Sequence, residues 1–267
     1  MKLTGWRRIA AAIWGPPRDP QIYGMLEVDA TNMLAFIERS RAAGHRVTVT
    51  HVVGRAIARA IGAVPDFNVV IRGTGAYPVD TVDVFFIAAV DGGRDLSGVK
   101  VANADRRSVY EVADELARRS AAMREGRDPD LARTKRVMER LPRPLLRASM
   151  AVSARLAGDF GLSVKPLGLS PRPFGSAMIT NIGSFGLPLG FAPLAWLYRT
   201  PLLLLVGEVV DRPMAVEGTV QVRPVLPITA TIDHRYADGW HISELFGPFR
   251  DYLADPAAHE TEPPPIG

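Results

Sequence analysis

The last third of the chain contains a long apolar run that leads directly into a short polar turn. Residues 220–232 have the composition of a buried strand, and residues 241–253 are typical of a helix. The turn between them, residues 233–239, carries His234 and Asp238. A histidine at the end of a strand can act as a general base near neutral pH, and an aspartate four residues on can fix the local backbone or the partners of the histidine. We therefore expect the function to lie at this turn.

Strand-like and helix-like patterns alternate along most of the chain. Thr31 is expected to cap the first helix, and Ser108 a later one with Glu111 as its capping-box partner. This alternation predicts an α/β sandwich in which a mixed sheet is covered by helices. Strands are expected at residues 22–29, 67–72, 82–90, 98–102, 175–180, 202–210 and 219–232, and helices at residues 31–43, from Thr48 or Thr50 to residue 64, and at residues 108–124 and 241–253.

Residues 128–173 interrupt this pattern, because prolines divide them into short helical pieces and loops. Both flanks continue one core, so we expect a helical insertion within a single domain that spans residues 1–267. The C-terminal tail, residues 255–267, contains four prolines and is expected to be extended. One helix of the insertion can carry an apolar stripe formed by Leu145, Leu146, Ser149, Val152, Leu156 and Phe160.

The composition limits the chemistry and the location. The chain has no cysteine, which excludes disulfides, thiolate nucleophiles and cysteine-ligated zinc. The first residues lack the apolar core of a signal peptide, and every apolar run is far shorter than the roughly 20 residues of a membrane span. We therefore expect a cytoplasmic protein.

Positive charge is concentrated in one segment. The chain carries a net charge of +4, and residues 131–160 contain seven basic and two acidic side chains, so this segment accounts for the whole excess. A solvated helix face is the simplest interpretation of such a segment. Docking to a membrane surface or to a protein partner is the alternative, and no nucleic-acid partner is expected.

Several motifs together resemble a known family. The ending Asp233-His234-Arg235, followed after two residues by Asp238-Gly239, resembles the signature of the dihydrolipoamide acyltransferase catalytic domain of 2-oxo acid dehydrogenase complexes. This family shares its fold with chloramphenicol acetyltransferase. Further matches occur in family order, at Arg7-Arg8-Ile9-Ala10, Leu26-Glu27-Val28-Asp29, Val47-Thr48-Val49-Thr50, Pro65-Asp66-Phe67-Asn68 and Ile179-Thr180-Asn181-Ile182-Gly183-Ser184-Phe185-Gly186.

The resemblance assigns roles to these positions. It implies that His234 is the base that deprotonates a thiol or hydroxyl acceptor, and that Asp238 organises the site with Arg8, or with Arg7, as its partner. The family uses a loop serine to stabilise the oxyanion, and Thr180 stands at the matching position. Threonine keeps the hydroxyl but adds a methyl group and restricts χ1. The same loop implies that coenzyme A is bound by Asn181, Gly183 and Ser184.

The resemblance also implies an assembly and substrates. It predicts a homotrimer that can join into a larger cage, with His234 of one subunit facing Thr180 of its neighbour across a channel. Coenzyme A is then a substrate, and the acyl group passes directly between it and the acceptor. The sequence shows no lipoyl-bearing segment, so a lipoyl acceptor would be carried by another chain. The insertion is expected to lie near the approach to Thr180.

The sequence allows three other interpretations. A metal site formed by His234, Asp238 and His241 lacks the regular spacing of metal ligands, so no metal is expected. A serine hydrolase would need a Gly-x-Ser-x-Gly turn, which the stretch from Gly183 to Gly186 does not provide. The remaining alternative is a trimeric scaffold of reduced or absent activity whose basic insertion docks a partner or a membrane surface.

Overall fold

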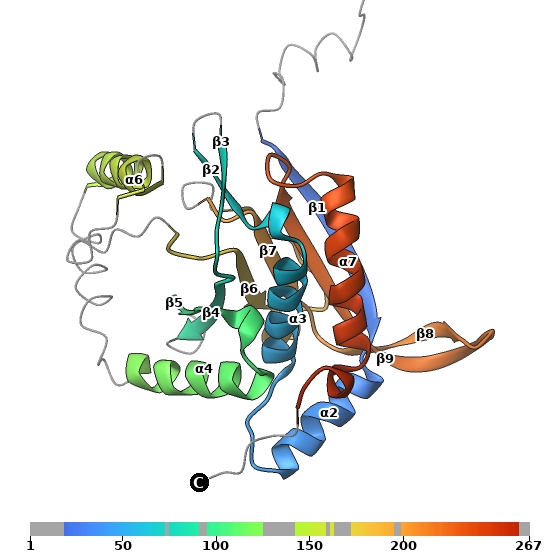
Figure 1. The fold of residues 1–267 in the computed structure, drawn as a ribbon. Coiled ribbons are helices and arrows are strands. Elements are labelled where there is room, and N and C mark those ends of the chain that lie inside the picture. Colours follow the sequence, from blue (N-terminus) through green and yellow to red (C-terminus); the bar gives the residue numbers. More distant parts are fainter. Residues whose placement is uncertain are drawn as a thin grey trace, which may run out of the picture.

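The computed structural model describes residues 19–72, 75–90, 95–124, 142–158, 161–162, 172–194 and 199–261, and a mixed seven-stranded sheet forms its centre (Figure 1). The strand order is β1-β9-β7-β6-β4-β5, with β8 paired to β9. β6 is parallel to β4 and β7, and the other pairs are antiparallel. The strands are β1 (Gln21–Asp29), β4 (Val84–Val90), β5 (Asp95–Val101), β6 (Ala177–Asn181), β7 (Leu202–Val206), β8 (Val210–Val216) and β9 (Thr219–Asp233).

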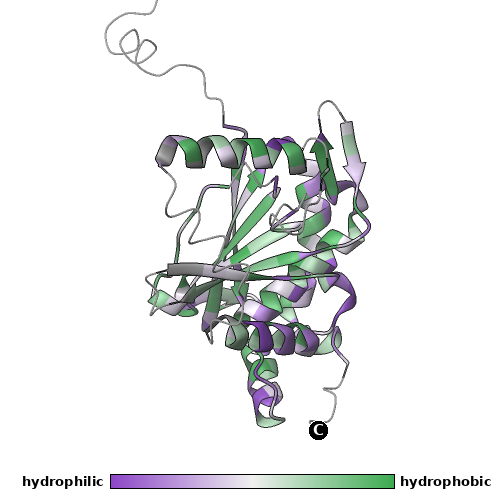
Figure 2. Ribbon diagram, turned by 90° about the vertical axis from the view of Figure 1, so that its left-hand side faces the viewer, coloured by the Kyte–Doolittle hydropathy of each residue, from purple (hydrophilic) through white to green (hydrophobic). Residues whose placement is uncertain are grey.

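Helices pack on one face of this sheet, which confirms the predicted α/β sandwich (Figure 1). A separate hairpin of β2 (Val69–Arg72) and β3 (Gly75–Pro78) lies beside it. The helices are α2 (Thr31–Ala42), α3 (Val49–Ala63), α4 (Val109–Arg124) and α7 (Gly239–Ala254). A further helix, α6 (Arg143–Gly158), comes from the predicted insertion and lies at the periphery of the fold (Figures 1 and 2).

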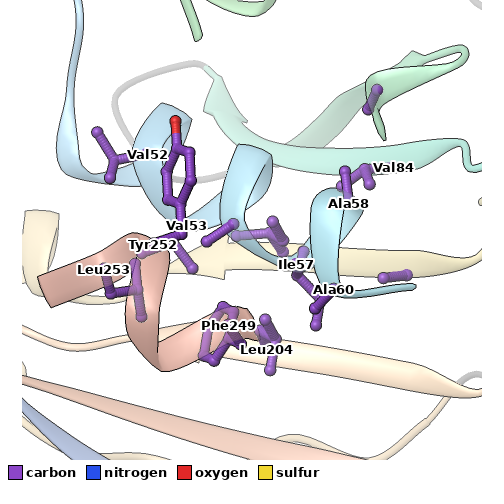
Figure 3. Close-up of a cluster of buried hydrophobic side chains, with 14 of the residues drawn as sticks. Val52, Val53, Ile57, Ala58, Ala60, Val84, Leu204, Phe249, Tyr252 and Leu253 are labelled. Carbon is purple, nitrogen blue, oxygen red and sulfur yellow. The ribbon is translucent and has the colours of Figure 1, made fainter. Parts of the chain in front are cut away.

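Helix α3 is the centre of the helical layer. Thr48 caps it by accepting a hydrogen bond from the backbone N–H of His51. Its apolar positions face the sheet and α7, where Ile57 and Phe249 belong to one buried cluster (Figure 3). Gly54 is required here because a Cβ at this position would overlap the ring of Phe86 on β4. Six apolar residues that recur at helical spacing in α3 are all buried, namely Val52, Val53, Ala56, Ile57, Ala60 and Ile61.

The opposite face of the sheet carries a smaller apolar cluster that includes Met178, Leu203 and Leu205. A loop is held over this face by two threonines of β9. The hydroxyl of Thr229 donates to the carbonyl of Gly190 at 2.5 Å, and the hydroxyl of Thr231 donates to the carbonyl of Ala192 at 2.8 Å. The two faces of the sheet therefore differ, since one is covered by helices and the other by an extended loop.

Small residues leave a cavity on the helical face. Gly24 on β1 pairs with Ala230 on β9, and neither residue has a side chain long enough to contact α7. The result is a cavity of about 240 Å³ lined by apolar side chains such as Ile242 and Phe246 of α7.

Several predicted boundaries were wrong. Thr31 does not cap α2, because its hydroxyl donates to the carboxylate of Asp29 and the N-cap is Ala30. The strand expected at 202–210 is divided, because the chain turns at Gly207, whose N–H donates to the carbonyl of Pro227. The capping box is confirmed, since the backbone N–H of Ser108 donates to Glu111 and the N–H of Glu111 donates to the Ser108 hydroxyl.

The tail is folded onto the body over its described part. Residues Pro256–Ala258 form a 3₁₀ turn rather than the expected extended chain. Glu260 then accepts hydrogen bonds from Arg55 on α3 at 3.2 Å and from the Tyr252 hydroxyl at 2.6 Å. This buried ion pair anchors the tail to α3 and α7, and residues 262–267 lie outside the described part.

Candidate functional site

His234 lies at the end of β9, where the strand leaves the sheet. Its backbone N–H donates to the carbonyl of Pro20 at 2.8 Å, which holds the turn against the start of β1. The side chain is exposed and borders an open hollow of about 450 Å³ lined also by Gln21 and Ile22. Within the described part of the chain the His234 ring makes no hydrogen bond. It is therefore free to contact a ligand.

The neighbours of His234 hold the turn rigidly. The buried carboxylate of Asp233 accepts from the Arg235 backbone N–H at 3.0 Å and from the Arg235 guanidinium at 2.5 to 3.2 Å. These hydrogen bonds raise the pKa of Arg235 above its usual value. Tyr236 is buried behind them, and its hydroxyl accepts from the backbone N–H of Ile71 at 3.4 Å. The histidine therefore stands on a turn fixed on both sides.

Asp238 fixes the local backbone, which is one of the two roles that its place in the sequence suggested. It is the N-cap of α7, where its carboxylate accepts from the backbone N–H groups of Trp240 and His241. The same oxygen lies 2.7 Å from Nδ1 of His241. The side-chain hydrogen bond to His241 is the main cause of a pKa of Asp238 below its usual value. Its expected partner, Arg8, lies outside the described residues, so that pairing stays a prediction.

Thr180 lies near the end of β6, on the face of the sheet that the helices do not cover. Its neighbour Ile179 points into the main core, while Met178 belongs to the cluster on the opposite face, so Thr180 shares the face of Met178. Thr229 stands two strands away in the same row and uses its hydroxyl to hold the loop. The Thr180 hydroxyl, by contrast, makes no hydrogen bond within the described part of the chain. It is available as a donor.

The loop after Thr180 is tied to α3. The side-chain amide of Asn181 donates to the hydroxyl of Thr50 at 2.7 Å, and its Oδ1 accepts from the backbone N–H of Ser184 at 3.0 Å. The Ser184 hydroxyl donates back to the carbonyl of Asn181 at 2.9 Å. Gly183 has no room for a side chain, since a Cβ there would lie 2.5 Å from the carbonyl oxygen of Gly207. These three predicted coenzyme A contacts thus also shape the loop.

Thr50 and His51 were missed as parts of this site. The sequence left the cap of α3 open between Thr48 and Thr50, and the structure uses Thr48, which leaves Thr50 free to hold Asn181. His51 is largely buried, and its Nδ1 has no hydrogen-bond partner in the described part of the chain. Burial is the main reason that the pKa of His51 is lowered to about 4. A buried neutral imidazole therefore lies next to Thr50 at the Thr180 end of the sheet.

The two halves of the predicted site lie at opposite ends of the sheet. Thr180 pairs with Leu205, which pairs with Thr229, and His234 follows five residues further along β9. At roughly 3.3 Å per residue and about 4.8 Å between strands, the two residues are on the order of 20 Å apart in one chain. One copy of the chain therefore does not bring them together.

The C-terminal end of α6, the main described part of the insertion, lies at the His234 end of the sheet. The end of α6 at Gly158 packs closely against the side chain of Arg199. Arg199 donates to the carbonyl of Ile71 at 2.5 Å, and Ile71 contacts Tyr236 of the His234 turn. Across subunits, an approach of the insertion to Thr180 stays a prediction.

Comparison with known proteins identifies the family. The model of the 2-oxoacid dehydrogenase acyltransferase catalytic domain matches residues 7–129 and 174–259. The chain belongs to this family. The acetyltransferase component of the pyruvate dehydrogenase complex of Bacillus subtilis (strain 168) is 25% identical over 261 residues, which are 96% of this chain and 50% of the relative. The chain thus spans about half the length of that relative.

Solved structures support the fold of this acyltransferase family member. A probable dihydrolipoamide acetyltransferase from Listeria monocytogenes is similar with a TM-score of 0.66 and 17% identity, covering 100% of this chain and 97% of that one. Chloramphenicol acetyltransferase is similar with a TM-score of 0.50 and 19% identity, covering 88% and 89% of the two chains. The chloramphenicol acetyltransferase-like fold is therefore confirmed.

Two kinds of feature are absent from the described residues, a metal cluster and a membrane-spanning helix. Among them, no three histidine or carboxylate side chains gather as a metal site. No helix in the same residues has the length and apolar character needed to cross a bilayer.

Proposed function

We propose that the chain is an acyltransferase that moves an acyl group between coenzyme A and a thiol or hydroxyl acceptor. Membership of the family and the place of the His234 turn support this proposal. The observation that carries it is the pair of unengaged groups at the two ends of the sheet, the His234 ring and the Thr180 hydroxyl. A dihydrolipoyl group on another chain is the acceptor that the family suggests.

The proposed reaction is a direct transfer. His234 takes the proton of the acceptor thiol or hydroxyl, and the acceptor attacks the thioester carbonyl to form a tetrahedral oxyanion. Thr180 donates a hydrogen bond to this oxyanion. When the intermediate collapses, the bond from carbon to the coenzyme A sulfur breaks, and His234 returns the proton to the leaving thiolate. No covalent acyl-enzyme is formed, and Asp238 keeps the start of α7 in place beside the base.

The site is proposed to form between copies of the chain. Since His234 and Thr180 are on the order of 20 Å apart in one copy, a base and an oxyanion donor can meet only if a second copy supplies one of them. A cyclic homotrimer closes three such contacts with one kind of interface. Each subunit then contributes its His234 end to one site and its Thr180 end to another.

Mixed assemblies test this arrangement. Assembled alone, His234→Ala should transfer no acyl groups at a measurable rate, and Thr180→Ala should transfer them at most at about a hundredth of the wild-type rate. Co-expressed in equal amounts, the two should recover roughly a quarter of wild-type activity, because random trimers then contain intact sites built from one copy of each. A radioactive acyl-CoA assay with dihydrolipoamide as acceptor measures this recovery.

Other outcomes would contradict the proposal. Full activity of the His234→Ala protein would show that His234 is not the base. Failure of the mixture to recover activity would show that the site is not shared between copies. An absence of acyl-CoA binding in calorimetry of the wild-type protein would favour the scaffold alternative instead.

A further inference from the structure

Helix α6 exposes three large apolar side chains. The side chains of Leu145, Val152 and Leu156 are 57%, 55% and 36% exposed. Together with Ser149 they recur at spacings of four, three and four residues, so they form one stripe along the helix. We call these four residues the α6 stripe. A helix face that met only water would carry polar residues at these positions, and the stripe therefore needs another explanation.

The rest of α6 is positively charged. The helix contains Arg143, Arg147 and Arg155 and no acidic residue. Arg155 is exposed, and at 100° per residue it lies on the flank of the α6 stripe. The helix is about 10–12 Å across, which is close to the Debye length of about 8 Å at physiological ionic strength, so the arginines would still be attracted to an anionic surface in contact with the stripe.

The position of α6 is compatible with docking. The family model leaves residues 130–173 unmatched, so α6 is outside the part of the chain that the family shares. Its C-terminal end is fixed beside Arg199 and, through Ile71, beside the His234 turn. Both figures that show the whole molecule place α6 at its periphery (Figures 1 and 2). The central sheet therefore does not block a surface from reaching the α6 stripe.

We propose that α6 docks the protein on an anionic lipid surface. The α6 stripe enters the boundary between headgroups and acyl chains, and the arginines interact with the negatively charged headgroups. The combination of an exposed apolar stripe with three cations and no anion selects this occupant, because an apolar protein groove would match the stripe but not the charge. Binding would bring the His234 turn close to the membrane surface. This inference does not depend on the acyltransferase activity.

Vesicle binding tests the proposal on the full chain. Wild-type protein should co-sediment with vesicles of phosphatidylglycerol and phosphatidylcholine in equal parts, and much less with phosphatidylcholine alone. The triple variant Leu145→Ser, Val152→Ser, Leu156→Ser should bind the anionic vesicles more than about tenfold more weakly. Replacing Arg143, Arg147 and Arg155 by glutamine should weaken binding about a hundredfold and remove its salt dependence.

A matched control separates the α6 stripe from exposed apolar residues in general. Val220 and Val222 on β9 are 78% and 72% exposed, and they lie in the hairpin with β8, away from α6. The variant Val220→Ser, Val222→Ser should bind vesicles like the wild type. Because all the replaced apolar side chains are exposed, circular dichroism and the thermal midpoint should be unchanged for each variant, which shows that it is folded.

Three results would overturn the proposal. The first is wild-type protein that does not bind anionic vesicles, and the second is a stripe variant that binds as well as the wild type. The third is a stripe variant that still binds vesicles but forms a smaller assembly than the wild type, as measured by the molar mass in light scattering. The α6 stripe would then be an interface between copies of this chain.

Discussion

The Thr180 end and the His234 end of the sheet are built in different ways. At the Thr180 end, the side chains of Asn181 and Ser184 bind the loop internally, and Thr50 ties it to α3. At the His234 end, the turn is held by its own backbone and by Arg235, and His234 is exposed to an open hollow. In the proposed reaction, the oxyanion donor Thr180 thus lies in a strand followed by a tightly bonded loop, and the base His234 is accessible to an acceptor.

The largest expected effect is on catalysis, at the Thr180 end. Thr180→Ala removes the unengaged hydroxyl and should lower kcat by about 10²–10³-fold, the usual cost of losing one oxyanion donor. Thr180→Ser keeps the hydroxyl and should stay within about tenfold of the wild type. Steady-state rates with saturating acyl-CoA measure both variants. Equal rates for the alanine and serine variants would show that the hydroxyl is not the donor.

Glycines at the two ends should differ in their tolerance of a methyl group. A Cβ at Gly183 would lie 2.5 Å from the carbonyl oxygen of Gly207, which is backbone and cannot move aside, whereas a Cβ at Gly239 would meet nothing within 4 Å. Gly183→Ala should therefore lower the free energy of unfolding by about 3 kcal/mol, and Gly239→Ala should change it by less than about 0.5 kcal/mol. Urea unfolding of the two variants compares them. A similar decrease in the free energy of unfolding for both variants would mean that the two glycines are packed equally closely.

The sequence predicted the helical layer better than it predicted the site. In α3, a repeat of apolar residues at helical spacing located both the helix and its buried face, because burial against a sheet is what selects such a repeat. The repeat in α6 is similar, yet Leu145, Val152 and Leu156 are exposed, and the side chains of Leu146 and Phe160 lie outside the described part. Periodicity shows which face of a helix is apolar and does not show what covers that face.

The contacts within the site depend on long-range pairing that a single sequence does not contain. Asn181 and Thr50 are 131 residues apart, and only the parallel placement of β6 against the other strands brings the loop to the start of α3. Asp238 is a different case. An aspartate directly before a helix is a common N-cap, so its local role could have been predicted from residue type alone.

A smaller effect is expected on stability at acidic pH, and it arises from His51 at the Thr180 end. Burial lowers the pKa of His51 from 6.5 to about 4 in the folded chain. As the pH falls below 6.5, the unfolded chain therefore binds a proton that the folded chain does not bind, and the free energy of unfolding decreases until the pH reaches about 4. Between pH 7 and 5 this loss should be about 2 kcal/mol, and His51→Gln should remove it. Urea unfolding at several pH values measures the difference. His259→Gln, whose ring stacks on Tyr252, is the control and should keep the full pH dependence.

The smallest effect is expected at the exposed end. The pKa of Asp238 is lowered by its hydrogen bonds to His241, so its charged form stabilises the folded chain above the ordinary pKa of an aspartate, and this contribution disappears as the pH falls through the lowered value. Asp238→Asn keeps a capping side chain but loses the charge, so its thermal midpoint should be slightly below that of the wild type at neutral pH. The difference should shrink below about pH 4.

Asp251→Asn, which changes an exposed residue of the same helix, serves as the control. A difference for Asp238→Asn that persists unchanged into acid would mean that the amide disturbs the cap itself, and that the charge of Asp238 does not hold the turn beside His234.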